Sequence, residues 1–352
     1  MEHILVHGGD WAGFKAAHGY LPLDFSANIS PLGVPRGVEE ALRSAAAQAD
    51  RYPDPLCRAM RKALSERESV PAEHILCGSG AADLVFRAVL ALRPRRALVT
   101  APTFAEYMAA LDSVGCAVTH YPLRAEDGFQ LQADILDAIT PRTGLVFLCE
   151  PNNPTGVTTA QPLLLRILKR CRETGTRLVV DECFGDFLDD PEAHTLKGAL
   201  EAFPDLLILK AFTKLYGMAG VRLGYALCSD TAFLERMRLA GQPWEVSSLA
   251  QAAGLAALEE TDYVRAVRAL TAAERPWLAR QLCDLGLRVI PGEANYLLFQ
   301  SEVPLCEPLR RRGILLRSCG NYIGLDDTWY RTAVRTHEDN QRLAAALREV
   351  LE

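Results

Sequence analysis

Between residues 74 and 228, the chain alternates short, continuously apolar runs with longer amphipathic stretches. Unbroken apolar runs of this kind are typical of strands that are buried on both faces of a sheet. They predict strands at residues 74–77, 97–100, 117–121, 144–149, 177–180, 206–209 and 221–228. The amphipathic stretches predict helices at residues 82–92, 105–114, 131–139 and 162–174. The alternation therefore indicates an α/β fold, with a mostly parallel sheet and helices on both faces.

The pattern changes on either side of this region. An arm punctuated by Pro and Gly comes first and leads into a predicted helix at residues 36–48. After residue 245 we expect helices at 246–258, 263–285 and 339–351, and strands at 287–290, 296–300, 314–317 and 329–334. These boundaries predict residues 1–50 as an N-terminal arm and helix that pack with a small domain, residues 51–245 as a large domain, and residues 246–352 as that small, C-terminal α+β domain.

Composition narrows the class of protein. The 352 residues are 49% hydrophobic and carry a net charge of −6, so we expect neither a nucleic-acid-binding nor a membrane-surface protein. The start of the chain lacks the basic and apolar regions of a signal peptide, and no apolar run approaches the roughly 18 residues of a membrane span. The ten cysteines form no Cys-x-x-Cys pair, which argues against a metal site and favours reduced thiols in the cytoplasm.

A glycine-rich stretch after the predicted strand at 206–209 offers a reactive combination of side chains. It contains Lys214, the hydroxyl of Thr213 directly before it, and Arg222 eight positions later. An amine can form an imine with an aldehyde, while a hydroxyl and a guanidinium can hold a phosphate. The stretch therefore suits a cofactor that carries both groups, although a lone lysine is more often a solvated surface residue.

Four further clusters follow predicted strands, where ligands of open α/β sheets bind. The glycine turn at 77–83 could hold an anion at a helix N-terminus or be an ordinary tight turn. Phe104 could stack on a flat ring or pack in the core. Asn153 lies in a Pro-Asn-Asn-Pro turn whose amides could also bind a ligand. Asp181 needs a partner at a buried strand end, such as a protonated pyridine nitrogen, unless it caps a helix.

In chain order, these clusters resemble the fold-type I family of pyridoxal-phosphate enzymes, the aspartate aminotransferase superfamily. The resemblance rests on Pro-Asn-Asn-Pro-Thr-Gly at 151–156, Asp-Glu-x-Phe at 181–184 and Thr-Lys-x-Tyr-Gly-x-x-Gly-x-Arg-x-Gly at 213–224, and it covers nearly the whole chain. Within the superfamily, the segments at 7–9, 24–29, 51–54, 242–244, 294–298 and 316–322 resemble the threonine-phosphate decarboxylase family of cobalamin biosynthesis, close relatives of the histidinol-phosphate aminotransferases.

The resemblance implies a role for each candidate toward pyridoxal 5'-phosphate (PLP) and a substrate. The catalytic residues would be Lys214, which carries the cofactor as an imine, and Asp181, which keeps the pyridine nitrogen protonated. The cofactor-binding residues would also include Gly80, Ala81, Ala82, Phe104, Asn153, Thr213, Arg222 and, from the neighbouring subunit of a homodimer with shared sites, Tyr52. The residues around the substrate would be His7, Gly8, Asn28, Asn153, Arg317 and Arg331.

Two positions depart from the superfamily pattern. Ala211 stands where a phosphate-binding serine is common, so one hydrogen bond to the phosphate is expected to be missing. Phe184 stands where aminotransferases usually have a tyrosine, and in this it resembles the decarboxylases. The resemblance therefore favours decarboxylation of O-phospho-L-threonine to 1-amino-2-propanol phosphate, with transamination of histidinol phosphate or a similar phosphorylated amine as the alternative.

Two other classes of protein would show different features in the sequence. An aminotransferase-like transcription regulator would carry a basic winged-helix segment, which we do not expect here. A dinucleotide-binding enzyme would need a Gly-x-Gly-x-x-Gly turn, which the glycine turn at 77–83 does not match.

Three arginines near the C-terminus predict an anionic substrate. By resemblance, Arg331 is expected to bind the α-carboxylate. Arg317 ends an apolar strand, and we expect it to turn into the site and to form, with His7 and Asn28, a pocket for a dianionic phosphate. Arg335 would face the same side as Arg331 if both lie on one strand, with a surface salt bridge as the ordinary alternative.

Overall fold

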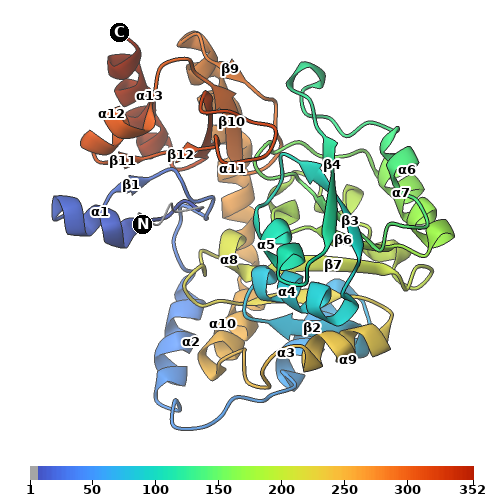
Figure 1. Ribbon diagram of the computed structural model, residues 1–352. Coiled ribbons are helices and arrows are strands. Elements are labelled where there is room, and N and C mark those ends of the chain that lie inside the picture. The colour runs from blue at the N-terminus through green and yellow to red at the C-terminus, as the bar shows by residue number, and fades with distance from the viewer. Residues whose placement is uncertain (1–6) are drawn as a thin grey trace.

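The computed structural model describes residues 7–352 and contains sheets of seven, four and two strands (Figure 1). The seven strands of the largest sheet follow the order β2-β8-β7-β6-β5-β3-β4. They are Ile75–Gly78 (β2), Arg96–Ala101 (β3), Ala117–Pro122 (β4), Leu145–Cys149 (β5), Arg177–Asp181 (β6), Leu206–Ala211 (β7) and Gly224–Leu227 (β8). Neighbours pair in parallel, except that β8 runs antiparallel to β2 and β7. The predicted mostly parallel sheet is confirmed.

Helices cover both faces of this sheet, as its unbroken apolar strands require. One face packs against α4 (Ala81–Leu92), α5 (Glu106–Asp112) and α9 (Thr231–Leu239). The other packs against α3 (Arg58–Glu68), α7 (Gln161–Thr174) and α10 (Ser248–Glu259). Alternate side chains of a strand serve the two faces. In β7, for example, Leu207 and Leu209 belong to the first core, and Leu206 and Ile208 to the second.

The strand order gathers the candidate chemistry at one end of the sheet. Strands β5, β6 and β7 are parallel neighbours, and Asn153, Asp181 and Lys214 lie at or just after their carboxyl ends. Strand β8 begins at this same end because it is antiparallel, so Arg222 arrives there as well. The packing is tight: a Cβ on Gly224 would lie 2.7 Å from the amide nitrogen of Ala81. Only glycine therefore lets β8 approach the start of α4 so closely.

The C-terminal part forms the four-stranded sheet β12-β13-β10-β9. Its strands are Arg288–Val289 (β9), Tyr296–Gln300 (β10), Arg317–Ser318 (β12) and Trp329–Ala333 (β13). The helices beside it are α11 (Thr261–Asp284), α12 (Cys306–Arg311) and α13 (His337–Leu351).

The N-terminal arm lies next to this C-terminal part. Its strand β1 (Leu23–Asp24) pairs in parallel with β11 (Ile314–Leu315) to form the two-stranded sheet. In Figure 1 the blue arm, which includes α1 (Trp11–His18), lies beside the red C-terminal elements. The helix α2 (Arg36–Ala46) instead packs against α10. The three-part division at residues 50 and 245 stays a prediction.

Several expected elements differ from those observed. The expected strand at 221–228 starts only at Gly224, because Arg222 has a left-handed φ of 63° that ends an extended run. The expected helix at 131–139 is limited to α6 (Ile135–Ala138). The expected strand at 314–317 is split between β11 and β12, which belong to different sheets. The sequence did not predict helices α1, α3, α9, α12 and the single turn α8 (Phe212–Leu215).

Of the two alternatives for Arg335, the salt bridge is the one observed. Strand β13 ends at Ala333, so Arg335 does not share a strand face with Arg331. Its guanidinium donates to Asp339 at 3.0 Å and to the carbonyl of Asp24 at 3.2 Å, which fits the structural alternative. Within residues 7–352, no helix combines the length and apolar character that a membrane crossing requires.

Candidate active site

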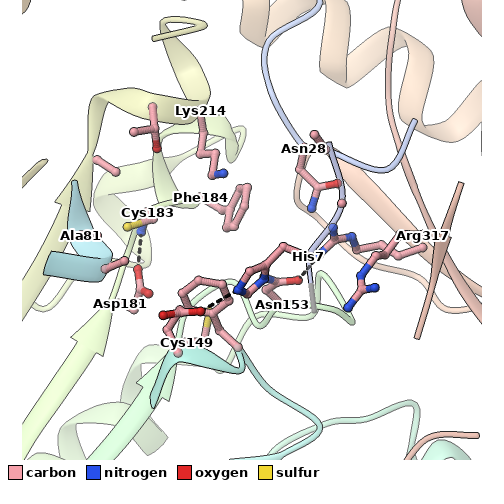
Figure 2. A pocket seen from close by; sticks show the side chains of 18 of the residues that line it. His7, Asn28, Ala81, Cys149, Asn153, Asp181, Cys183, Phe184, Lys214 and Arg317 are labelled. Carbon is pink, nitrogen blue, oxygen red and sulfur yellow. Dashed lines mark hydrogen bonds and ion pairs between the residues drawn. The ribbon is translucent and has the colours of Figure 1, made fainter. Parts of the chain in front are cut away.

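A cavity of about 370 Å³ lies at the carboxyl ends of the central strands, between the large sheet, the arm and the C-terminal sheet (Figure 2). Figure 2 shows Lys214 and Asp181 on one side of it and Asn28 and Arg317 on the other. The predicted site residues that line the cavity are His7, Gly8, Asn28, Ala81, Ala82, Phe104, Asn153, Asp181, Thr213, Lys214, Arg222, Arg317 and Arg331. Distant parts of the sequence thus meet around one volume.

Lys214 presents its amine to this cavity. It lies on α8 (Phe212–Leu215), the single helical turn that follows β7. Burial, the largest cause, together with the guanidinium groups of Arg331 and Arg222, lowers the pKa of the amine to about 8. The neutral form of an amine is its nucleophilic form. Lys214 therefore has a larger reactive fraction near neutral pH than a solvated lysine.

Lys210 lies on the same chain segment but serves a different purpose. Its Nζ lies 3.2 Å from Asp186 and 3.9 Å from Glu182, away from the cavity lining. Burial alone would lower the pKa of Lys210, but the surrounding carboxylates, led by Asp186, raise it above the ordinary value. Lys210 is therefore a charged structural lysine, and Lys214 is the lysine that lines the cavity in the described chain.

Asp181 is the last residue of β6 and is almost fully buried. Its Oδ1 accepts the backbone N–H of Cys183 at 3.0 Å, and its Oδ2 accepts the hydroxyl of Tyr107 at 2.7 Å. These two hydrogen bonds fix the carboxylate. Because an ionised carboxylate has about four acceptor positions, Asp181 can still accept from a cationic ligand in the cavity.

The start of α4 and the guanidinium of Arg222 form an anion cradle. Gly80 precedes the helix with a φ of 86°, and no side chain caps the N–H groups that follow it. A Cβ on Gly80 would lie 2.8 Å from Arg222 Nη2, so glycine is needed for the guanidinium to approach the helix terminus. Helix N-termini and guanidinium groups both favour phosphate. With Thr213 beside them, these residues fit the phosphate of PLP.

Two arginines form the opposite wall. Arg317 and Arg331 are paired across β12 and β13, and both line the cavity. Like charges in directly opposed positions destabilise a sheet, so this pair favours an anion between or beside the two groups. Arg331 donates to the carbonyl of Ser26 at 2.9 Å and to Asn153 Oδ1. Arg317 donates to Asn321 at 2.8 Å.

Two buried polar atoms at this wall also indicate a ligand. Among residues 7–352, Asn28 Oδ1 and Arg331 Nε are buried without a hydrogen-bond partner. Leaving such groups unpaired costs about 1–3 kcal/mol each, which a polar ligand would offset.

The arm contacts the start of α5 and the loop before it, beside the cavity. His7 Nε2 lies 2.6 Å from Glu106 Oε1, and its ring centroid lies 5.9 Å from that of Phe104. The hydrogen bond from His7 lowers the pKa of the Glu106 carboxyl. Glu106 was not predicted as a site residue, although it lies within the Pro-Thr-Phe-Ala-Glu-Tyr segment that carries Phe104.

The sequence did not predict every residue that lines the cavity, and two predicted residues lie outside it. Cys149 and Cys183 line it, but an isolated cysteine in a strand gives no signal of a site. Gly80 acts through the cradle and does not itself line the cavity. Tyr52 is 81% exposed and stacks on Trp244 with ring centroids 4.6 Å apart, so it does not reach the cavity of its own chain.

Comparison with known proteins gives one family and a consistent set of relatives. Residues 22–347 match the model of the family "Aminotransferase class I and II". The chain is 42% identical to a threonine-phosphate decarboxylase of Salmonella typhimurium, over 98% of this chain and 96% of that relative. It is 37% identical to a histidinol-phosphate aminotransferase of Symbiobacterium thermophilum, over 92% and 89% of the two chains.

A solved structure supports the fold independently. The histidinol-phosphate aminotransferase of Sinorhizobium meliloti, solved in complex with PLP, superposes with a TM-score of 0.88 at 23% identity, covering 97% of this chain and 95% of that one. At this identity the similarity establishes a shared fold.

The pKa of Lys214 predicts how cofactor capture depends on pH. In cofactor-free protein, the rate of PLP capture should rise about tenfold per pH unit below pH 8 and level off above it, because only the neutral amine attacks. Stopped-flow absorbance measures the rate, and borohydride reduction followed by peptide mapping identifies the lysine. Lys214→Arg is the control and should capture none. Label on Lys210, or a rate independent of pH, would contradict the assignment.

Proposed function

Because the chain belongs to the class I and II aminotransferase family, we propose that it is a PLP-dependent lyase that decarboxylates O-phospho-L-threonine to 1-amino-2-propanol phosphate. The observation that carries this proposal is the composition of the cavity. A buried Lys214–Asp181 end faces an Arg317–Arg331 end, so an amine and two anionic groups of one substrate find partners in the same volume. The 42% identity to a threonine-phosphate decarboxylase supports this substrate, and with it a place in cobalamin biosynthesis.

The residues present fit PLP. Lys214 would join its aldehyde, and Asp181 would accept from its ring nitrogen. Ala81, Ala82, Thr213 and Arg222 would hold its phosphate, with no serine hydroxyl available at Ala211. Phe104 would stack on its ring, and Asn153 would bond its ring oxygen. When bound, PLP supplies an electron sink for the electron pair left at Cα after a bond there breaks.

The protein's own residues would then determine which bond at Cα breaks. The bond that stands perpendicular to the cofactor ring is the one that breaks, so the substrate's orientation decides the reaction. Arg317, His7 and Asn28 would hold the phosphate and turn Cα until its carboxylate leaves the ring plane. Arg331 would contact that carboxylate, and too strong a grip would oppose its loss by stabilising the ground state. The carboxylate would be lost as carbon dioxide, and its bonding electron pair would stay at Cα. Lys214, protonated by the ammonium group of the incoming substrate, would deliver that proton to Cα.

Transamination of histidinol phosphate or a similar phosphorylated amine is the second candidate, supported by the 37% identity to a histidinol-phosphate aminotransferase. The position of Phe184 favours the decarboxylase. Its ring lines the cavity and packs edge-on against Tyr296 at 4.9 Å, so it offers no hydroxyl to a ring oxygen.

We further propose a cytoplasmic homodimer with shared active sites. The stacked and exposed Tyr52 and Trp244 support a contact between subunits, because large exposed aromatic side chains are favoured at protein interfaces. Tyr52 would reach the cofactor phosphate in the neighbouring site. The ten free cysteines support a reducing compartment.

Product analysis tests the reaction. PLP-loaded protein incubated with O-phospho-L-threonine should release carbon dioxide and 1-amino-2-propanol phosphate without any added 2-oxo acid. Mass spectrometry of the products and trapping of labelled carbon dioxide measure this. The control is histidinol phosphate with 2-oxoglutarate, which should yield little glutamate. Amino transfer that depends on the 2-oxo acid, with no carbon dioxide, would favour the second candidate instead.

Arg317 should determine the preference for a phosphorylated substrate. Arg317→Ala should lower kcat/KM for O-phospho-L-threonine by about 10- to 100-fold, since a charged hydrogen bond is lost, and should change that for L-threonine little. Arg335→Ala is the matched control, because this arginine lies outside the cavity and should leave the ratio unchanged. An equal loss on both substrates would make Arg317 structural.

Subunit mixing tests the shared site. A mixture of Lys214→Ala and Tyr52→Phe proteins, exchanged through mild denaturation, should show more activity than the two parents together. A mixed dimer would contain one site with both an intact lysine and an intact tyrosine. Mixing Lys214→Ala with Asp181→Asn is the control and should restore nothing, because both residues come from the same chain. Sedimentation that reveals an active monomer would refute the dimer.

A further inference from the structure

Tyr107 is a fully buried tyrosine that lies behind the cavity and does not line it. It is on α5, and its hydroxyl donates to Asp181 Oδ2 at 2.7 Å. The other oxygen of Asp181 accepts the backbone N–H of Cys183 at 3.0 Å, and the thiol of Cys183 also interacts with this carboxylate. The hydroxyl has no access to solvent, and its side-chain neighbours are the carboxylate of Asp181 and the thiol of Cys149.

The ring of Tyr107 makes two further contacts. It stacks on Phe147 of β5 with a centroid distance of 4.6 Å and an interplanar angle of 3°. Its edge meets Phe104 at 5.6 Å and 83°, a favourable aromatic geometry. The side chain is therefore fixed against the sheet while it contacts both Asp181 and Phe104, which are the two residues assigned to the nitrogen and the face of the cofactor ring.

We propose that Tyr107 is a positioning residue that holds the carboxylate of Asp181 toward the cavity and so keeps the proton on the ring nitrogen of the cofactor. This inference rests on the proposed function, because it requires PLP in the cavity. A donor to a carboxylate favours the charged form over the neutral acid. The proton shared between Asp181 and the ring nitrogen should therefore stay on the nitrogen, where it strengthens the electron sink.

The hydroxyl is suited to remain a donor. Burial, followed by the charge of Asp181, raises the pKa of Tyr107 well above its usual range, so the phenol does not ionise at physiological pH. The structure offers a second buried pair of the same kind for comparison. The hydroxyl of Tyr225 donates to Glu68 at 2.5 Å, and neither residue lines the cavity.

The experiment compares dissociation constants for PLP and for 1-deazapyridoxal phosphate, in which a C–H replaces the ring nitrogen, by fluorescence titration of cofactor-free protein. Tyr107→Phe should weaken PLP binding about tenfold and leave the deaza analogue within about twofold of wild type, because only PLP needs an ionised Asp181. Tyr225→Phe removes the same kind of donor elsewhere, and it should leave both constants unchanged.

The outcomes separate the two proposals. Equal weakening of both ligands, or no effect on either, would overturn the role of Tyr107. Failure of wild-type protein to bind PLP at all would instead overturn the proposed function.

A measurement on wild-type protein covers the case in which Tyr107→Phe does not fold. With ¹³C placed site-specifically at Cζ of Tyr107, the NMR resonance should differ between protein loaded with PLP and protein loaded with the deaza analogue. Identical resonances would show that the hydroxyl does not sense the ring nitrogen, and would overturn the proposal.

Discussion

The site depends on the carboxylate of Asp181, which is fixed in the protein interior. Asp181 ends a strand that is buried on both faces, and a charge in that position is expensive unless it is paired and hydrogen-bonded. Two donors from the protein fix its orientation but leave part of its acceptor capacity for a ligand. Helix α5 supplies Tyr107 and the turn after β6 supplies the N–H of Cys183, so both elements orient this carboxylate.

Two lysines four residues apart show how strongly the surroundings decide chemistry. Lys210 is enclosed by carboxylates that raise its pKa, so its amine stays charged. Lys214 is placed after the strand ends, where burial and nearby guanidinium groups lower its pKa to about 8. The boundary between the end of β7 and the turn of α8 thus separates a structural cation from an amine with a lowered pKa.

Much of this arrangement could be predicted from the chain alone. Unbroken apolar runs gave the central strands, since parallel sheets bury both faces, and their carboxyl ends located the candidate residues. Local sequence patterns could not predict contacts between residues that are far apart in the chain. Tyr107 and Glu106 contact residues 74 and 99 positions away, and no local periodicity reports such partners. The sequence did not predict the break between Leu315 and Arg317 for a similar reason, because the two halves of one apolar run belong to two different sheets.

That break has a mechanical consequence. Backbone hydrogen bonds flank the pairing of the arm with β11: the N–H of Leu23 donates to the carbonyl of Gly313, and the N–H of Phe25 donates to the carbonyl of Leu315, each at 2.8 Å. Two residues further on, the same piece of chain carries Arg317 into the C-terminal sheet. The positions of the arm and of this guanidinium are thus linked through the two-stranded sheet, the smallest sheet in the described structure. Only Leu316 separates the strand that pairs with the arm from Arg317, so we expect a displacement of the arm to move this arginine as well.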